Sequence, residues 1–429
     1  MHKKHHFFSE ITFQACVIIL LAAGFYLYEF ILQVSPAVFS NVLLRDFATN
    51  ATGLGAMSGC FYYSYTVMQL PAGLLLDRFN ARFILTLVCI ICAFGALLFS
   101  FSHSIAAASV ARFIMGGASA FAFISVLHLA VRWIPAVHFA FFAGIAEMMG
   151  SIGAIGGSAP LAILLNHFTW RIIMFGFAIA GLGLAILIFL IVKNHPANLD
   201  LPLNYKRPKS NGVFTDVKII LRNRETWFIG LYSFFIWAPV LAFSALWGVS
   251  FLTVSCKLSN IAAAQAIAFV WLGVALSGPA IGWLSDVIKR RCVLMTICAL
   301  FGAVSMMIVI FVVNMNLLVL YVLMFVLGFA SAGQTLSFAL IRDNNSPLTN
   351  SAANGFNNMV VVAGGFLFQP LIGRFLDFNW HGAILNGARM YNLHSYQQAF
   401  IVLPACYFIA ALSSMLLIRE TRCISRWND

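Results

Sequence analysis

The segment Gly73-Leu-Leu-Leu-Asp77-Arg78-Phe-Asn-Ala-Arg82 lies between two long apolar runs of this 429-residue chain. A related segment, Gly282-Trp-Leu-Ser-Asp286-Val-Ile-Lys-Arg-Arg291, lies between two others. The two aspartates are separated by close to half of the chain, so the sequence is that of a duplicated membrane protein with one copy of this polar connection in each half. The duplication favours transport over catalysis.

Composition places the chain in the membrane class. Hydrophobic residues make up 62% of it and charged residues 9%, and its mean hydropathy is +0.94, outside the range of soluble globular domains. A membrane-spanning helix needs roughly 20 apolar residues, and twelve such runs lie between about residue 13 and residue 418. The sequence therefore predicts an all-α membrane protein of twelve transmembrane helices in two pseudo-symmetric six-helix bundles.

One long polar stretch divides the chain in the middle. We expect an N-terminal bundle over residues 1–192, a cytoplasmic linker over 193–226 and a C-terminal bundle over 227–429. The linker contains three prolines and a basic cluster, which suits either a plain solvated tether or a tether with a short amphipathic surface helix.

Basic residues predict the orientation. Most of the 25 lysine and arginine residues fall in segments that are cytoplasmic if the N-terminus is inside. We therefore expect a protein of the bacterial inner membrane with both termini on the cytoplasmic side. The net charge of +12 is spread over loops between spans, which indicates contact with anionic lipid and no nucleic-acid partner. The first apolar run is expected to stay in place as a span and not to be a cleaved signal.

Further motifs repeat between the halves and resemble a known family. Arg112 followed by Gly116-Gly117, and a glycine series that ends at Pro160, are similar to signatures of the major facilitator superfamily, as are the two segments quoted above. The glycine series is Gly150, Gly153, Gly156 and Gly157. Other motifs resemble a bacterial branch related to lysosomal dipeptide carriers: Trp170-Arg171, Leu246-Trp-Gly248, Gln334-Thr-Leu-Ser-Phe338, Gly355-Phe-Asn-Asn-Met359 and Gln369-Pro-Leu-Ile-Gly373.

The resemblance implies a gate built from the two polar connections. In the family, the residue at Asp77 meets the N-terminus of span 11, and those at Arg78 and Arg82 hold neighbouring helices. Gly73, Gly282 and Asp286 belong to the same predicted gate. The second copy has no arginine directly after Asp286, so we expect the first half to hold the inner gate more firmly. The alternative is a connection that only sets topology.

Two ionisable residues lie deep in spans, where they are costly and therefore candidates for function. Glu29 lies near the middle of span 1, and Arg112 lies inside span 4. Since spans 1 and 4 line the central cavity in proteins of this fold, the pair could bind a zwitterion or an anion, with Glu29 as a proton acceptor. A structural ion pair is the alternative.

A second candidate pair for proton coupling is His128, at the inner end of span 4, with Glu147 in span 5. A structural hydrogen bond between them is the alternative. The second half offers neutral amides and aromatic side chains instead of deep charges. From these we select Trp237, Gln265, Gln334 and Asn357 as candidate substrate contacts, against the alternative of packing or interfacial anchoring.

These observations predict a monomeric secondary transporter that moves a small polar solute, zwitterionic or anionic, by alternating access. We expect a proton-coupled symporter, with sodium left open as the coupling ion. The alternatives are an exporter of an amphiphilic compound such as a drug or siderophore, and a non-transporting receptor. No P-loop, HExxH or GxSxG motif occurs, so we expect neither an enzyme nor a cofactor. Cys89 and Cys92 form a CxxC without a second ligand pair, so no metal site is expected.

Overall fold

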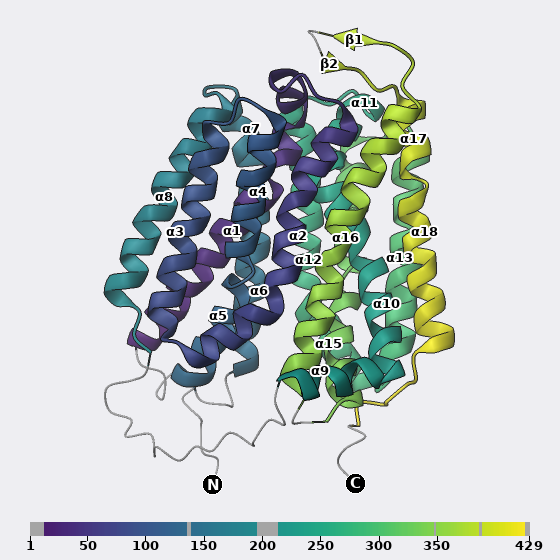
Figure 1. Ribbon diagram of the computed structural model, residues 1–429. Helices are drawn as coiled ribbons and strands as arrows, with labels where there is room; N and C mark the ends of the chain where they lie inside the picture. Colours follow the sequence, from purple (N-terminus) through teal and green to yellow (C-terminus); the bar gives the residue numbers. More distant parts are fainter. Residues whose placement is uncertain (1–12, 135–138, 195–212, 347–348, 386–387, 425–429) are drawn as a thin grey trace.

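The structure is a computed structural model that describes residues 13–134, 139–194, 213–346, 349–385 and 388–424. Long helices form nearly all of it, with one short β-hairpin at one end (Figure 1). The two chain termini, whose location was predicted, and the middle of the predicted linker lie outside the described residues.

The first half of the chain forms the N-terminal bundle. Two of its spans are made of two helices each, Ile105–Trp133 and Ile145–Leu165. Its helices are α1 (Phe13–Asp46), α2 (Ala51–Arg78), α3 (Ala81–Ser100), α4 (Ile105–Ser119), α5 (Ala122–Trp133), α6 (Phe139–Gly156), α7 (Ala159–Leu165) and α8 (Trp170–Ile191).

The second half forms the C-terminal bundle, preceded by the short helix α9 (Val213–Arg222). Its first span is interrupted by a π-helix, η2 (Val240–Trp247), directly after Pro239. The other elements are α10 (Arg224–Pro239), α11 (Gly248–Ser255), α12 (Asn260–Ile288), α13 (Arg291–Phe311), α14 (Leu317–Ala330), α15 (Gly333–Asn344), α16 (Asn350–Phe378), β1 (Ile384–Leu385), β2 (Ala388–Arg389), α17 (Leu393–Phe400), α18 (Val402–Leu412) and η3 (Ser413–Leu417). The two strands are antiparallel, with Ile384 opposite Arg389.

Eleven helical segments of the described chain are long and apolar enough to cross a membrane. The remaining long helix of the N-terminal bundle, α2, has 28 residues but contains more glycine, serine, threonine and tyrosine. Small residues let helices approach closely in a bilayer, and α2 packs along α16 of the other bundle. With α2, the predicted fold class of two six-helix bundles is confirmed.

The duplication also appears in how the helices pack. Gly116 of α4 lies so close to the main chain of Phe61 in α2 that an added Cβ would collide with its carbonyl oxygen. Gly328 of α14 has the same relation to the main-chain oxygen of Val270 in α12. Only glycine fits at these two positions, since any side chain would force the paired helices apart. The same glycine contact therefore brings equivalent helices together in both bundles.

The two bundles meet at the end that carries the β-hairpin, which we call the hairpin end (Figure 1). There, the hydroxyls of Ser40 and Ser250 lie 2.6 Å apart across the boundary between the bundles, and Asn260 donates to the carbonyl of Val38 at 3.4 Å. We call the opposite end, where α1 begins and η3 ends, the termini end. Among the described residues, a Cβ added at Gly73 or Gly282 there would meet nothing within 4 Å. The bundles are thus closed together at the hairpin end.

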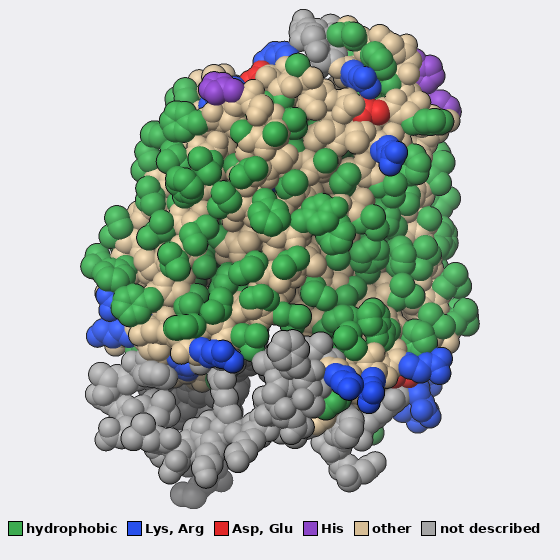
Figure 2. All heavy atoms as spheres, viewed as in Figure 1, with side chains coloured by type: hydrophobic (Ala, Val, Ile, Leu, Met, Phe, Trp, Pro, Cys, Tyr) green, Lys and Arg blue, Asp and Glu red, His purple; other side chains and the backbone are tan. Residues whose placement is uncertain are grey.

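The surface of the molecule suits a bilayer. Figure 2 shows hydrophobic side chains covering the middle of the visible face, with lysine and arginine side chains at its two rims. Large exposed hydrophobic side chains include Phe94 of α3, Ile179 and Ile186 of α8 and Val322 of α14. A soluble protein rarely exposes so continuous an apolar surface, so the chain is an integral membrane protein.

Candidate functional site

Glu29 lies in the middle of α1 and its side chain is completely buried. Neither carboxyl oxygen has a hydrogen-bond partner in the described part of the chain. Arg112 of α4 and Ser119 at the end of the same helix lie close enough to interact with it. Burial of an ionised carboxylate without a partner costs several kcal/mol, so this environment accommodates the neutral carboxyl better.

The guanidinium of Arg112 is also buried, with an exposed fraction of 1%. Its Nη1 donates to the main-chain oxygen of Leu32 at 2.7 Å and its Nη2 to that of Gln33 at 3.1 Å. The ring of Phe61 lies 4.6 Å from the guanidinium carbon, a cation–π distance. Nε has no partner among the described residues. Arg112 therefore binds the backbone of α1, while its Nε stays available to donate.

Pro36 explains why the Leu32 carbonyl of α1 is available to Arg112. A proline within a helix has no N–H to donate to the carbonyl four residues earlier, and its ring pushes that carbonyl aside. The carbonyl in question is that of Leu32, which receives hydrogen bonds from Arg112 and from the hydroxyl of Ser35 at 2.9 Å. As predicted, Glu29 and Arg112 lie near each other. The hydrogen bonds of Arg112, however, go to the backbone of α1 and not to the Glu29 side chain.

A series of buried polar side chains continues from this point toward the C-terminal bundle. Gln33, whose carbonyl Arg112 binds, donates from Nε2 to the hydroxyl of Tyr62 in α2 at 3.1 Å. The amide of Gln369 in α16 interacts with the same hydroxyl and donates to the carbonyl of Leu241 in the π-helix at 2.8 Å. Sequence reasoning did not select Gln33, Tyr62 or Gln369 as site residues. A tyrosine and two glutamines inside apolar runs were the available signal.

Trp271 of α12 was not selected from the sequence either. Its ring packs edge-on against Phe30, the neighbour of Glu29, with 6.0 Å between ring centroids. Its indole nitrogen is buried and has no partner among the described residues. Because Phe30 and Trp271 belong to different bundles, this contact joins them beside Glu29.

The predicted substrate contacts of the second half are dispersed. Asn357 is fully buried and already paired, since it accepts from Ser233 at 2.9 Å and donates to Ser337 at 2.8 Å. Gln265 is exposed in the second turn of α12 at the hairpin end, where Tyr321 donates to it at 3.3 Å. Trp237 and Gln334 are half-buried. Asn357 thus ties together three helices of its own bundle, and Gln265 lies far from mid-depth.

The second predicted coupling pair is located on neighbouring helices. His128 is half-buried on α5 and Glu147 is exposed on α6. Glu147 acts electrostatically on the phenols of Tyr26 in α1 and Tyr65 in α2. Two tyrosines are thus close enough to interact with Glu147, and a proton relay with His128 stays a prediction.

The residues of the first predicted gate lie at the termini end of α2 and α3. Arg78 is exposed. The guanidinium carbon of Arg82 lies 4.4 Å from the ring centroid of Phe189 in α8. The side chain of Asp77 lies outside the described residues, so its predicted contact with the start of α16 is not seen.

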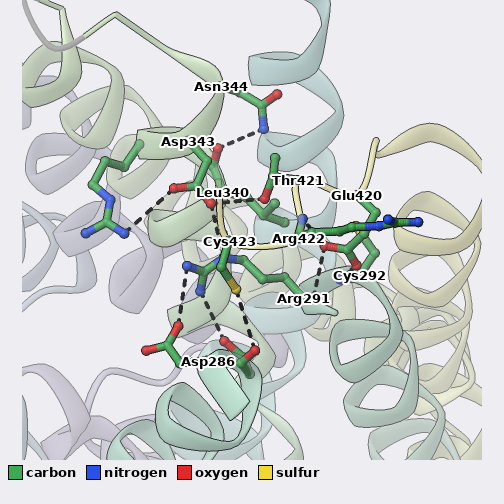
Figure 3. Close-up of polar contacts among 12 residues, drawn as sticks. Asp286, Arg291, Cys292, Leu340, Asp343, Asn344, Glu420, Thr421, Arg422 and Cys423 are labelled. Atoms are coloured by element: carbon green, nitrogen blue, oxygen red, sulfur yellow. Dashed lines mark hydrogen bonds and ion pairs between the residues drawn. The ribbon is translucent and has the colours of Figure 1, made fainter. Parts of the chain in front are cut away.

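The second predicted gate has a denser set of polar contacts (Figure 3). Arg291 is buried, with its Nη2 3.5 Å from Asp286 and its Nε 3.1 Å from Asp343 of α15. Asp343 also accepts from the hydroxyl of Thr421 at 3.0 Å. No arginine follows Asp286 directly. When the two segments are aligned, Arg291 corresponds to Arg82, and Arg291 is the residue that pairs with Asp286. Arg291 belongs to the segment quoted from the sequence but was not selected as a gate residue. Asp343 and Thr421 were missed because they are distant from it in sequence.

The segment after η3 also caps a helix. Glu420 accepts from the main-chain nitrogens of Arg291 at 3.1 Å and Cys292 at 2.8 Å, in the first turn of α13. In the N-terminal bundle, Asn194 after α8 accepts from the nitrogen of Ala81 in the first turn of α3 at 2.9 Å. Both caps satisfy amides that a helix start leaves unpaired, so the pseudo-symmetry extends to the ends of the two bundles.

A membrane protein with two bundles, a boundary that is closed at one end, and buried ionisable groups at mid-depth has the architecture of a secondary transporter. Residues 15–369 and 242–422 match the Major Facilitator Superfamily. The chain belongs to this family.

Several relatives show how far the similarity extends. The chain is 24% identical to the uncharacterized transporter YybO of Bacillus subtilis over 63% of this chain and 65% of that protein. It is 22% identical to the probable sulfoacetate transporter SauU of Cupriavidus necator over 40% of each, and 22% identical to the probable hexose phosphate transport protein of Chlamydia pneumoniae over 62% of this chain and 63% of the other. In each case the match spans less than two thirds of the relative.

A solved structure confirms the fold over most of the chain. It is a bacterial homologue of the human lysosomal transporter Spinster in an inward-facing and unoccupied conformation, with a TM-score of 0.75 and 16% identity. The match covers 94% of this chain and 97% of the other.

Proposed function

We propose that the protein is a secondary transporter of a small organic anion, coupled to protons as a symporter, in a bacterial inner membrane. One observation carries the proposal: at mid-depth, a fully buried carboxyl at Glu29 lies near the buried Arg112, and neither this carboxyl nor the Nε of Arg112 has a hydrogen-bond partner among the described residues. The working unit is a monomer with bundles over 1–192 and 227–429 and the linker 193–226 between them. If the termini end is cytoplasmic, the described arrangement is the inward-facing one.

Two observations support an anionic solute: the buried arginine and the substrates named for two relatives. Sulfoacetate and hexose phosphates, named for two relatives, are anions at neutral pH. An arginine can hold a carboxylate, sulfonate or phosphate in two parallel hydrogen bonds. In this chain the Nε edge of Arg112 would receive the anion, because its two Nη groups bind the carbonyls of Leu32 and Gln33.

Glu29 is the proposed proton site, and Glu147 with His128 is the second candidate. A carboxyl in an apolar environment binds a proton more readily than one in water, and an anion that arrives at Arg112 adds negative charge nearby. Proton and anion would therefore bind together, because each lowers the cost of burying the other. At the termini end, Asp77 with Arg78 and Arg82, and Asp286 with Arg291, are the proposed inner gate.

Ligand binding by purified protein tests the proposal. We expect a thermal shift with sulfoacetate, glutamate or hexose 6-phosphate that grows as the pH falls, and no shift with neutral sugars or amino alcohols. R112A should abolish the shift and R112K should retain part of it, since an ammonium cannot form the bidentate contact. Wild-type affinity in R112A, or a shift with neutral solutes alone, would contradict the anion site.

A further inference from the structure

The carboxylate of Asp377, near the end of α16, reaches across the boundary between the bundles to the first turn of α2. Its Oδ2 accepts from the main-chain nitrogen of Thr52 at 2.8 Å and from the Thr52 hydroxyl at 2.6 Å. Its Oδ1 accepts from the main-chain nitrogen of Ala51 at 3.3 Å. The start of a helix presents free amides and the positive end of its dipole, so a carboxylate that is only 12% exposed is well held there.

Two residues of the C-terminal bundle hold this carboxylate in place. The hydroxyl of Tyr391 donates to Oδ1 at 2.5 Å and accepts from the nitrogen of Ala51 at 3.0 Å. The Nη1 of Arg389 lies 3.2 Å from the same oxygen. Asp377 therefore reaches α2 as an acceptor that its own bundle has already oriented, which lowers the cost of forming the contact.

The sequence around Asp377 repeats the first gate segment. Gln69, Gly73 and Asp77 have the same spacing in α2 as Gln369, Gly373 and Asp377 have in α16. Each aspartate is the last residue but one of its helix. Because α2 and α16 run in opposite directions side by side, each helix carries its aspartate to the end where the other helix begins (Figure 1).

The two ends of this helix pair are in different states. At the hairpin end, Gly373 packs so closely on the main chain of Ala51 that an added Cβ would collide with it. At the termini end, a Cβ added at Gly73 would meet no atom of the described residues within 4 Å. The glycine–aspartate segment of α16 thus packs closely on α2 at one end of the pair, while the counterpart glycine of α2 has no such close contact with the described residues at the other end.

We infer that Asp377 is a positioning residue for transport: it fastens α2 to α16 while the hairpin end is closed, as the counterpart of Asp77 at the termini end. The inference rests on the proposed alternating access. When the hairpin end opens, the amides of Ala51 and Thr52 must leave Asp377, and the contact proposed for Asp77 forms at the other end. Loss of one charged contact is then offset by gain of the other, which keeps the two conformations close in free energy.

Thiol labelling of purified protein in nanodiscs tests this inference. Ser40 is buried at the hairpin-end boundary, so Ser40→Cys, in a background that lacks the nine native cysteines, reacts with a water-soluble maleimide only when that end opens. We expect Asp377→Asn to raise the labelling rate about tenfold, because the amide keeps the shape but loses the charge at the helix start. Asp77→Asn should lower the rate.

Three further variants make the result decisive. Asp46→Asn alters a carboxylate at the same end whose partners, Trp170 and Arg171, lie in its own bundle, so it should leave labelling unchanged. Asp377→Glu should restore part of the slow labelling. If Asp377→Asn does not fold, Tyr391→Phe weakens the same contact and should give a smaller increase. A rate within twofold of the parent in the folded Asp377 and Tyr391 variants, or an equal increase in Asp46→Asn, would overturn the inference.

Labelling needs no solute, so its outcome is independent of the proposed substrate. If Asp377→Asn speeds labelling while no anion binds, the inference holds and the anion proposal fails. If anions bind and are transported while labelling is unchanged, the proposed function stands and Asp377 has no positioning role.

Discussion

Arg112 donates to the carbonyl of Leu32 at 2.7 Å. In a regular helix this carbonyl would accept from the N–H of residue 36, but residue 36 is a proline and has no N–H. The buried arginine therefore completes the hydrogen bonding of a proline-containing helix in addition to its proposed role with the solute. Stability and function are linked at this one side chain, and they can be separated by experiment.

Arg112→Ala should destabilise the protein, because it removes the hydrogen bonds from a buried guanidinium to the carbonyls of Leu32 and Gln33, and a hydrogen bond to a charged group contributes roughly 1.5–3 kcal/mol. Pro36→Ala supplies an N–H for Leu32, so the double variant Pro36→Ala with Arg112→Ala should recover part of the loss. Thermal unfolding in detergent, measured for both single variants and the double variant, gives the coupling between the two sites. Strictly additive effects would show that Arg112 does not serve the carbonyl that Pro36 frees.

Asn357→Ala should lower stability by roughly 0.6–2 kcal/mol, the range of side-chain hydrogen bonds between membrane helices, since it removes the tie from Ser233 to Ser337. The Michaelis constant for the solute should stay unchanged. Asn358→Ala, at the half-buried neighbouring position, is the matched control. An altered Michaelis constant with unchanged stability would instead support the substrate contact predicted from sequence.

The two carboxylates on Arg291 should differ sharply. Asp343→Asn removes the charge of a group that is 3% exposed. Breaking a buried pair in this way costs roughly 3–5 kcal/mol, because the buried Arg291 is left with the exposed one of its two carboxylate partners, Asp286. Asp286 is 68% exposed, so Asp286→Asn should cost about 0–1 kcal/mol. Equal losses of thermal stability in the two variants would contradict this ranking.

The sequence predicts the fold class well because spans, duplication and close helix packing leave local signals. Apolar runs, the repeated Gly73 and Gly282 segments, and glycines such as Gly116 and Gly328 can be read along the chain. Glu29 and Arg112 could be selected because charged residues in apolar runs are rare.

The partners of these residues could not be predicted in the same way, since they are set by contacts between distant helices. Arg112 binds backbone carbonyls of α1, which carry no sequence signal of their own beyond Pro36. Asp377 and Thr52 are brought together only by the pairing of α2 with α16. Asn357 was selected for its amide, but whether an amide faces solute or a neighbouring helix depends on side-chain direction.

The central claim is that Glu29 carries the proton that drives accumulation of an anion bound near Arg112. Uptake into proteoliposomes under an imposed pH gradient tests it most directly, with sulfoacetate, glutamate and hexose 6-phosphate as probes and with counterflow exchange measured in parallel. The account predicts that wild-type protein accumulates at least one of these anions when the outside is acidic, and that Glu29→Gln abolishes accumulation while it retains exchange. Accumulation by Glu29→Gln equal to that of the wild type would contradict the account.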